Sequence, residues 1–147
     1  MADLAQTPAN VLPSSAAVKQ RITAAVAILG GQPYYLDPTT LDARGLPEAR
    51  LCLATGAPPV GQCAGLAATS VAAGQQFDGI IDDPGPFAHG LAGAVAGNII
   101  VVSDANAGGL CLSGGTVTAG DYVNVGGVCI SATQMVLRRV VGTTPHA

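Results

Sequence analysis

A short unit occurs four times in this chain: a glycine, then a residue with a side-chain amide or carboxyl, then an extended apolar run. The units begin at Gly31-Gln32, Gly74-Gln75, Gly97-Asn98 and Gly120-Asp121. The last three glycines are 23 residues apart, and the first precedes them by 43. Glycine reaches positive φ without steric cost and short polar side chains bond to local backbone, so each unit predicts a turn. The runs that follow have the β-branched or aromatic residues typical of strands. The repeat therefore predicts a compact all-β domain.

The composition indicates one domain that is poor in charge. At 147 residues the chain is long enough to bury a core. Only 10% of its residues are charged, against about 25% in typical globular chains. Hydrophobic residues make up 49%, yet aromatic residues make up only 3% and Trp is absent. Packing is therefore expected to rest on many small side chains, and the low charge indicates that part of the surface is covered in an assembly.

The sequence disfavours a membrane span, a secretory signal and nucleic-acid binding. The uncharged stretches Leu51 to Phe77 and Pro84 to Ser103 are interrupted by Gly, Pro and polar residues, so neither predicts a membrane span. The N-terminus lacks the basic and apolar regions of a signal peptide, which predicts a soluble, non-secreted protein. A net charge of −3 and six scattered cations argue against nucleic-acid binding.

The predicted fold class is all-β (mainly β), a small β-barrel or β-sandwich with an extended N-terminal arm and at most one short helix. Residues 1–14 contain two prolines and no clear period, so we expect an arm that is ordered only when a partner holds it. Residues 15–147 are expected to form a single β-domain. Residues 16–29 fit a helix or a strand, and the glycine pair that follows favours strand, turn, strand. One helical turn is expected near residues 48–54, where Pro and Glu resemble a helix start.

Further strands are expected near residues 62–69, 75–81, 87–92, 98–103, 109–113, 121–126 and 127–141. Glycine turns are expected to separate most of them, among them Asp83-Pro-Gly85, Gly114-Gly115 and Gly126-Gly127. The last strand alternates imperfectly, which predicts a bulge near Ala132-Thr133.

No catalytic constellation is evident. His89 lies beside Phe87 and Leu91 at a period of two, on the same face of a predicted strand, so a strand or interface histidine is a better interpretation than a general base. A triad of His89, Asp104 and a serine has no Gly-x-Ser-x-Gly motif to support it. We therefore predict no enzyme activity and no cofactor.

Metal ligation and disulfides are also disfavoured. The spacing of the acidic cluster Asp78, Asp82 and Asp83 does not match a calcium-binding loop, and the Asp-Asp-Pro-Gly sequence is typical of a turn. We therefore expect no metal site. The four cysteines, Cys52, Cys63, Cys111 and Cys129, have no zinc-like spacing. Three of them lie inside apolar runs, where buried free thiols are expected, and a disulfide would require an oxidising compartment.

A series of short segments occurs in a characteristic order along the chain. They are Met1-Ala-Asp-Leu4, Gly31-Gln-Pro-Tyr-Tyr-Leu-Asp37, Ala64-Gly-Leu-Ala67, Ala72-Ala-Gly-Gln-Gln76, Val101-Val-Ser-Asp104, Ala107-Gly-Gly-Leu110 and Thr118-Ala-Gly-Asp-Tyr-Val123 followed by Gly126-Gly-Val128. Their order resembles that in the head decoration, or cement, proteins of tailed bacteriophages. The resemblance covers almost the whole chain, but its motifs are turns and strands. The cysteines, the segment Leu51–Gln62 and the turn Asp82–Pro86 depart from that pattern.

The resemblance implies a structural virion protein on the outer surface of an icosahedral capsid, made in the host cytoplasm. Its expected partners are the major capsid protein and further copies of itself, most simply as a trimer, with no nucleic acid and no membrane. A tail or fibre component, including a receptor-binding tip, is the alternative. The arm is expected to lie across capsid subunits, and Arg138-Arg139 to pair with a partner's acid or to form a solvated end. The candidate capsid contacts are Leu4, Pro8, Asn10, Val11, Leu12, Pro13, Arg138 and Arg139.

Overall fold

The computed structural model describes residues 3–113, 119–138 and 140–147, and these ranges contain strands and no helix. None of the described residues belongs to a helix that could cross a membrane. The strands are β1 (Gln6–Leu12), β2 (Val18–Thr23), β3 (Pro33–Leu41), β4 (Pro47–Leu51), β5 (Gly65–Ala67), β6 (Gln76–Leu91), β7 (Ile99–Val102), β8 (Leu110–Leu112), β9 (Asn124–Cys129), β10 (Gln134–Leu137) and β11 (Val140–Val141). The all-β prediction is confirmed. The helical turn predicted near residues 48–54 is wrong, because Pro47–Leu51 pairs with β3 as strand β4.

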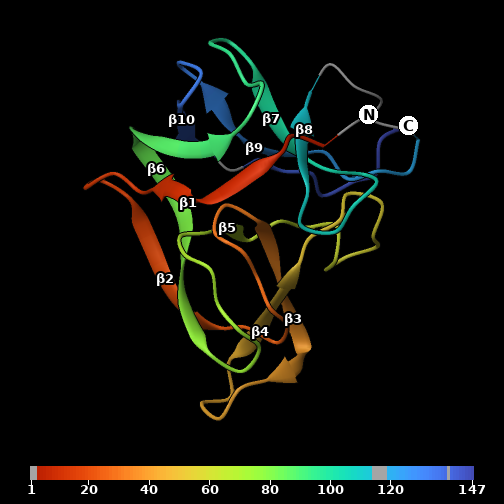
Figure 1. The fold of residues 1–147 in the computed structure, drawn as a ribbon. Helices are drawn as coiled ribbons and strands as arrows, with labels where there is room; N and C mark the ends of the chain where they lie inside the picture. The colour runs from red at the N-terminus through yellow and green to blue at the C-terminus, as the bar shows by residue number, and fades with distance from the viewer. Residues whose placement is uncertain (1–2, 114–118, 139) are drawn as a thin grey trace.

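The strands form a sheet that curls into a half-barrel (Figure 1). Its main path is β4-β3-β5-β6-β10-β9-β7-β8, while β1 and β2 attach to β6 and β11 attaches to β9. These strand pairs are antiparallel. The first half of β6 lies between β2 and β5, and its second half lies between β1 and β10. One strand therefore joins the two parts of the molecule.

The 16 residues of β6 replace two predicted strands and the turn between them. Asp83-Pro-Gly85 does not reverse the chain. Pro84 and Pro86 lack backbone donors, and the pairing with β10 shifts register between Met135 and Leu137. The chain consequently bends here and continues as strand (Figure 1).

The predicted strand 127–141 is also different in the structure. Residues 130–133 connect β9 to β10 as a hairpin, closed by the Ile130 N–H donating to the Gln134 carbonyl at 2.9 Å. Ala132-Thr133 is therefore part of this connection and not a bulge. Gly126-Gly127, predicted as a turn, lies inside β9. A Cβ at Gly127 would stand 2.6 Å from the Val136 carbonyl oxygen, so glycine permits close strand contact there. The predicted turn Gly114-Gly115 lies outside the described residues.

The four repeated glycines do occupy turns. In the turn Leu29–Gln32 the Gln32 N–H donates to the Leu29 carbonyl, and the Gln32 side-chain oxygen accepts from the Leu29 N–H at 2.8 Å. The turn Val95–Asn98 repeats both hydrogen bonds, with 2.9 Å for the side-chain one. A positive φ at the third residue is the signature of a type II turn. The φ angles are +86° at Gly31, +82° at Gly74, +87° at Gly97 and +100° at Gly120.

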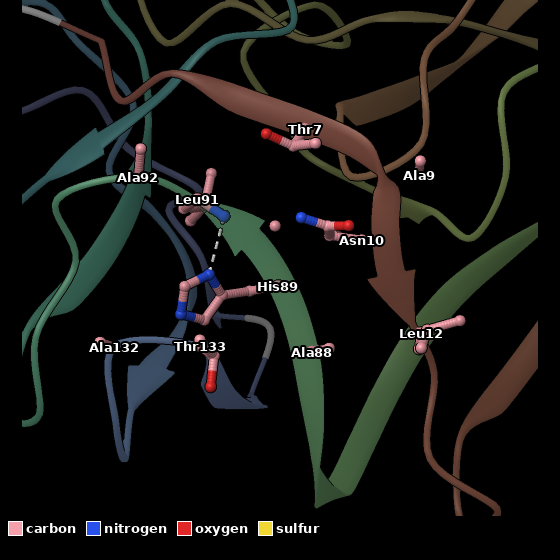
Figure 2. Close-up of a pocket in the computed structure, with 11 residues that line it drawn as sticks. Thr7, Ala9, Asn10, Leu12, Ala88, His89, Leu91, Ala92, Ala132 and Thr133 are labelled. Carbon is pink, nitrogen blue, oxygen red and sulfur yellow. Dashed lines mark hydrogen bonds between the residues drawn. The ribbon is translucent and has the colours of Figure 1, made fainter.

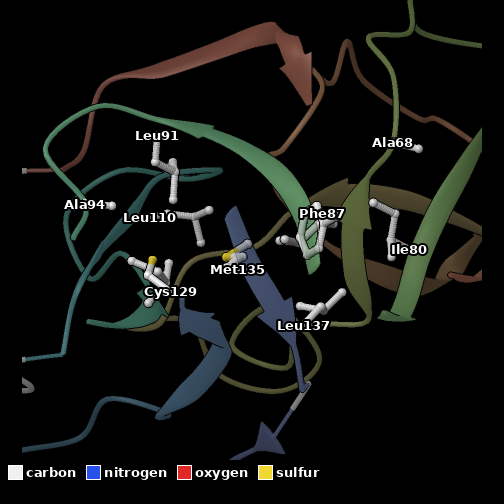
Figure 3. Packing of buried hydrophobic residues seen from close by; sticks show 11 residues of the cluster. Ala68, Ile80, Phe87, Leu91, Ala94, Leu110, Cys129, Met135 and Leu137 are labelled. Atoms are coloured by element: carbon white, nitrogen blue, oxygen red, sulfur yellow. The ribbon is translucent and has the colours of Figure 1, made fainter. Parts of the chain in front are cut away.

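The core is built mainly from aliphatic side chains of modest size. One cluster joins β6 to β7, β8, β9 and β10 around Phe87, Met135 and Leu137 (Figure 3). A second lies between β2, β3, β4 and the start of β6, where the rings of Tyr34 and Phe77 meet edge to face at 5.3 Å. A third, smaller cluster holds Cys52, Ala54, Cys63 and Val102.

Candidate functional site

The N-terminal segment is extended, but it lies on its own domain. β1 pairs with the end of β6, Val11 is buried in the core, and the Leu4 N–H donates to the Leu110 carbonyl at 2.8 Å. The expected division at residue 14 therefore does not separate an arm from a domain. Hydrogen bonds to β6 and burial of Val11 hold the segment without a partner.

β1 departs from β6 in its middle and opens a groove. Gln6 lies opposite Leu91, yet the next partners are Val11 and His89, so three extra residues are accommodated on β1. Pro8 in this stretch has no N–H to donate to a ladder. Gly90 has a φ of +66°, and a Cβ there would stand 2.5 Å from the Thr7 carbonyl oxygen. The bulged part of β1 therefore lies directly against Gly90, where a side chain would not fit.

The groove has a volume of about 430 Å³ and no charged residue in its lining. Three segments meet there: β1, the end of β6 and the β9–β10 connection (Figure 2). The lining residues are Thr7, Ala9, Asn10, Leu12, Ala88, His89, Gly90, Leu91, Ala92, Ala132 and Thr133. Such a surface suits contact with an uncharged peptide segment or with apolar groups. It offers small side chains, hydroxyls and an amide, and it has no charge to attract ions.

His89 lies at the wall of this groove with its side chain buried. Its Nδ1 accepts from the Leu91 N–H at 2.9 Å, so a neutral ring carries its proton on Nε2. Nε2 is buried and has no hydrogen-bond partner among the described residues. Burial lowers the pKa of His89, and the Ser131 backbone opposes this shift. Phe87 and Leu91 are buried as well, which confirms the predicted alternation.

Two aspartates of the acidic cluster have structural partners. Asp83 is fully buried and accepts from Ser14, while Asp78 pairs with Arg21 at 3.0 Å. No group of three metal-ligating side chains occurs in the described ranges. No hydrogen bond joins His89 to Asp104 or to a serine side chain in the part of the chain that is described. All four cysteines are buried free thiols, one more than the three for which burial was expected.

The predicted capsid contacts fall into separate environments. Asn10 and Leu12 line the groove, and the Leu12 side chain is 65% exposed. Leu4 and Val11 are poor candidates for partner contact, because Leu4 packs against the core cluster and Val11 is part of the buried interior. Pro8 and Pro13 are half-buried, and Arg138 is exposed just beyond β10. Arg139 lies outside the described residues.

The sequence reasoning missed Thr7, Ala9 and Thr133 as parts of one surface. The groove is created by pairing between β1 and β6 and by the position of the β9–β10 hairpin. A signal for it was present in Pro8 and Gly90, which mark places where regular pairing is interrupted.

A comparison with protein-family models, with curated proteins and with solved structures finds no match to this chain.

Proposed function

We propose that this chain is a structural, non-enzymatic head decoration protein. It binds the outer surface of an icosahedral phage capsid and stabilises the shell by bridging major capsid protein subunits. The resemblance of its segment order to such proteins motivates this function. The observation that carries it is a row of solvent-exposed aliphatic side chains across β7, β9 and β10.

The row follows directly from the strand register. Val128 of β9 lies opposite Ile99 of β7 on one side and opposite Val136 of β10 on the other. Directly opposed residues of antiparallel strands place their side chains on the same face. Ile99 is 41% exposed, Val128 is 39% exposed and Val136 is half-buried. Ile130, two residues beyond Val128, is 47% exposed. Three adjacent strands thus present β-branched side chains to solvent.

An exposed apolar row favours adhesion over catalysis. Full burial of one aliphatic side chain contributes about 1.5–3 kcal/mol, so covering several of them supplies substantial binding free energy. Contiguous exposed apolar surface usually marks an interaction site. Large uncharged contacts are what a protein needs in order to hold shell subunits together. The groove beside β1, with exposed Leu12, offers a second uncharged contact surface.

The test is capsid occupancy measured by electron microscopy and by co-sedimentation with shells that lack this protein. Val128→Asp should lose binding, because a carboxylate would be buried in the contact. Val128→Thr keeps the shape and should bind more weakly than wild type. Leu46→Asp is the matched control, since Leu46 is 48% exposed in the connection between β3 and β4, away from the row.

Wild-type occupancy by a folded Val128→Asp variant would contradict the role of the row. Labelling of tails instead of heads would overturn the decoration function in favour of a tail component. Self-association is measured separately by native mass spectrometry, where a trimer is the expected species.

The contact made by β1 is tested by a point substitution. Deletion of residues 2–13 would remove buried Val11 and the strand that covers β6, so it would test folding instead of binding. Leu12→Asp alters only an exposed side chain at the groove, and reduced occupancy is the expected result.

A further inference from the structure

Two cysteines lie together where the chain crosses from one side of β3 to the other. β4 and β5 flank β3, and residues 52–64 connect them. The Cys52 N–H donates to the Pro33 carbonyl at 3.1 Å, and the Ala64 N–H donates to the Tyr34 carbonyl at 2.7 Å. Cys52 and Cys63 therefore stand at the two ends of the crossover, beside neighbouring residues of β3.

The two thiols share one small buried cluster with Ala54 and Val102. The Cys52 side chain is 0% exposed and that of Cys63 is 4% exposed. The pKa of the Cys52 thiol is raised, mostly by its side-chain hydrogen bond with Cys63 and secondly by its burial. The two side chains therefore lie close enough to interact within that cluster. Each thiol also has a backbone acceptor, Val60 for Cys52 at 3.1 Å and Gly65 for Cys63 at 3.4 Å.

A buried asparagine fixes the second end of the crossover. Asn124 is 1% exposed, and its side-chain oxygen accepts from the Cys63 N–H at 3.2 Å. Its amide group donates to the Gly61 carbonyl and, at 3.0 Å, to the Tyr122 carbonyl. The other end is held by Ala54, whose N–H donates to Ser103 and whose carbonyl accepts from Tyr122, at 2.9 and 2.8 Å. Both cysteines consequently keep fixed positions relative to each other.

We propose that Cys52 and Cys63 are a modification site that forms an intramolecular disulfide with a small-molecule disulfide as oxidant. A disulfide needs its two Cβ atoms about 3.5–4.5 Å apart, and two buried thiols that share one small cluster at the two ends of a single crossover are the pair best placed to form one. Cys111 and Cys129 are buried elsewhere, since Cys129 belongs to the large cluster around Met135 and Cys111 lies on β8. The reaction is therefore specific to one pair of the four.

The exchange with oxidised glutathione proceeds in two balanced steps. One protein thiol loses its proton and attacks the glutathione disulfide, releasing one glutathione thiolate and leaving a mixed disulfide. The second protein thiol loses its proton and attacks the protein sulfur of that mixed disulfide, releasing the second glutathione. Two electrons pass from the cysteine pair to glutathione. Because the thiols are buried and a thiolate is disfavoured there, the first step goes through molecules in which the crossover has opened.

The proposal is tested on the reduced full-length protein with excess oxidised glutathione, followed by alkylation in denaturant and peptide mass mapping. The expected product has lost two hydrogen atoms, carries a Cys52–Cys63 link and keeps alkylated Cys111 and Cys129. Its unfolding midpoint in urea should exceed that of the reduced protein, because the link restricts the unfolded chain.

Two variants make the result specific. Cys63→Ala should abolish the intramolecular link, whereas Cys111→Ala, which removes another buried thiol, should retain it. Mixed glutathione adducts without the link, or a link that includes Cys111 or Cys129, would overturn the proposal. So would a lower urea midpoint for the oxidised protein, because it would mean that the bond strains the native crossover.

Discussion

Ser14 and Asp83 are 69 residues apart in the sequence, and two hydrogen bonds join them at the bend of β6. The Ser14 N–H donates to one carboxylate oxygen at 2.9 Å, and its hydroxyl donates to the other. On one side of this contact Leu12 pairs with Ala88, and on the other Val18 pairs with Asp82. The connection between β1 and β2 therefore follows the bend of β6, and the serine–aspartate contact fixes the two bends to each other.

Ser14→Ala should lower the free energy of unfolding by about 1–3 kcal/mol, because one oxygen of a buried carboxyl loses its donor. Ser15→Ala is the control, since Ser15 is exposed next to it. Urea denaturation followed by circular dichroism measures both. Equal midpoints for the two variants would show that the contact at the bend contributes nothing to stability.

Two glycine substitutions separate backbone strain from steric overlap. Gly74 has a φ of +82° and open space where a Cβ would stand, so Gly74→Ala should cost about 1–2 kcal/mol from the left-handed backbone alone. At Gly79 a Cβ would overlap the Tyr34 hydroxyl, which accepts from Gln20 at 2.8 Å. Gly79→Ala should cost about 1–3 kcal/mol from overpacking and also change the near-ultraviolet tyrosine signal. A tyrosine signal altered in Gly74→Ala as well would contradict this distinction.

Stability should fall in acid partly through Asp37. The Thr39 side chain and backbone N–H lower the pKa of Asp37 to about 2, with further help from Thr40 and Arg50. Because the folded pKa lies below the unfolded value of 3.8, this stabilisation is present above that value and is lost as the pH falls through about 2. Asp37→Asn should flatten the pH dependence of the urea midpoint in that window.

Thr39→Val should give an intermediate slope, since it removes the hydroxyl donor at 2.6 Å but leaves the backbone donor at 2.9 Å. Some slope should remain in both variants, because the Arg44 side chain also lowers the pKa of Asp42. A full wild-type slope in Asp37→Asn would contradict the assignment.

His89 should add a second pH dependence at higher pH. Burial lowers its pKa below the ordinary value of 6.5, so the unfolded chain takes up this proton before the folded protein does. The neutral histidine therefore favours the folded state fully above pH 6.5, and this contribution is lost as the pH falls through the folded pKa. His89→Asn keeps an acceptor near the Leu91 N–H but cannot titrate, so its urea midpoint should vary less with pH below 6.5. Variation equal to that of wild type would contradict a lowered His89 pKa.

The sequence predicted best where local chemistry decides the structure. Each repeated glycine has a positive φ, because only glycine reaches that conformation without strain. The sequence also predicted that His89 shares one strand face with Phe87 and Leu91, since side chains on a strand alternate between faces, and all three are buried.

Elements that depend on distant partners were predicted less well. Asp83-Pro-Gly85 has the composition of a turn, but pairing of the flanking segments with β1, β2, β5 and β10 makes it a bend within one strand. Pro47 resembled a helix start, yet pairing with β3 determines that it begins a strand. Pro8 and Gly90 indicate that regular pairing is interrupted, but the shape of the groove depends on the register between Val11 and His89, which neither segment determines alone.

The course of β6 has a mechanical consequence. Since a single strand passes from the β2–β5 side of the molecule to the β7–β10 side, a pull between those sides is carried along covalent backbone. Separating them requires the bend of β6 to straighten, which first breaks the contact between Ser14 and Asp83. Under tension from a partner held at each end, the protein should therefore extend at this bend before its strands shear apart.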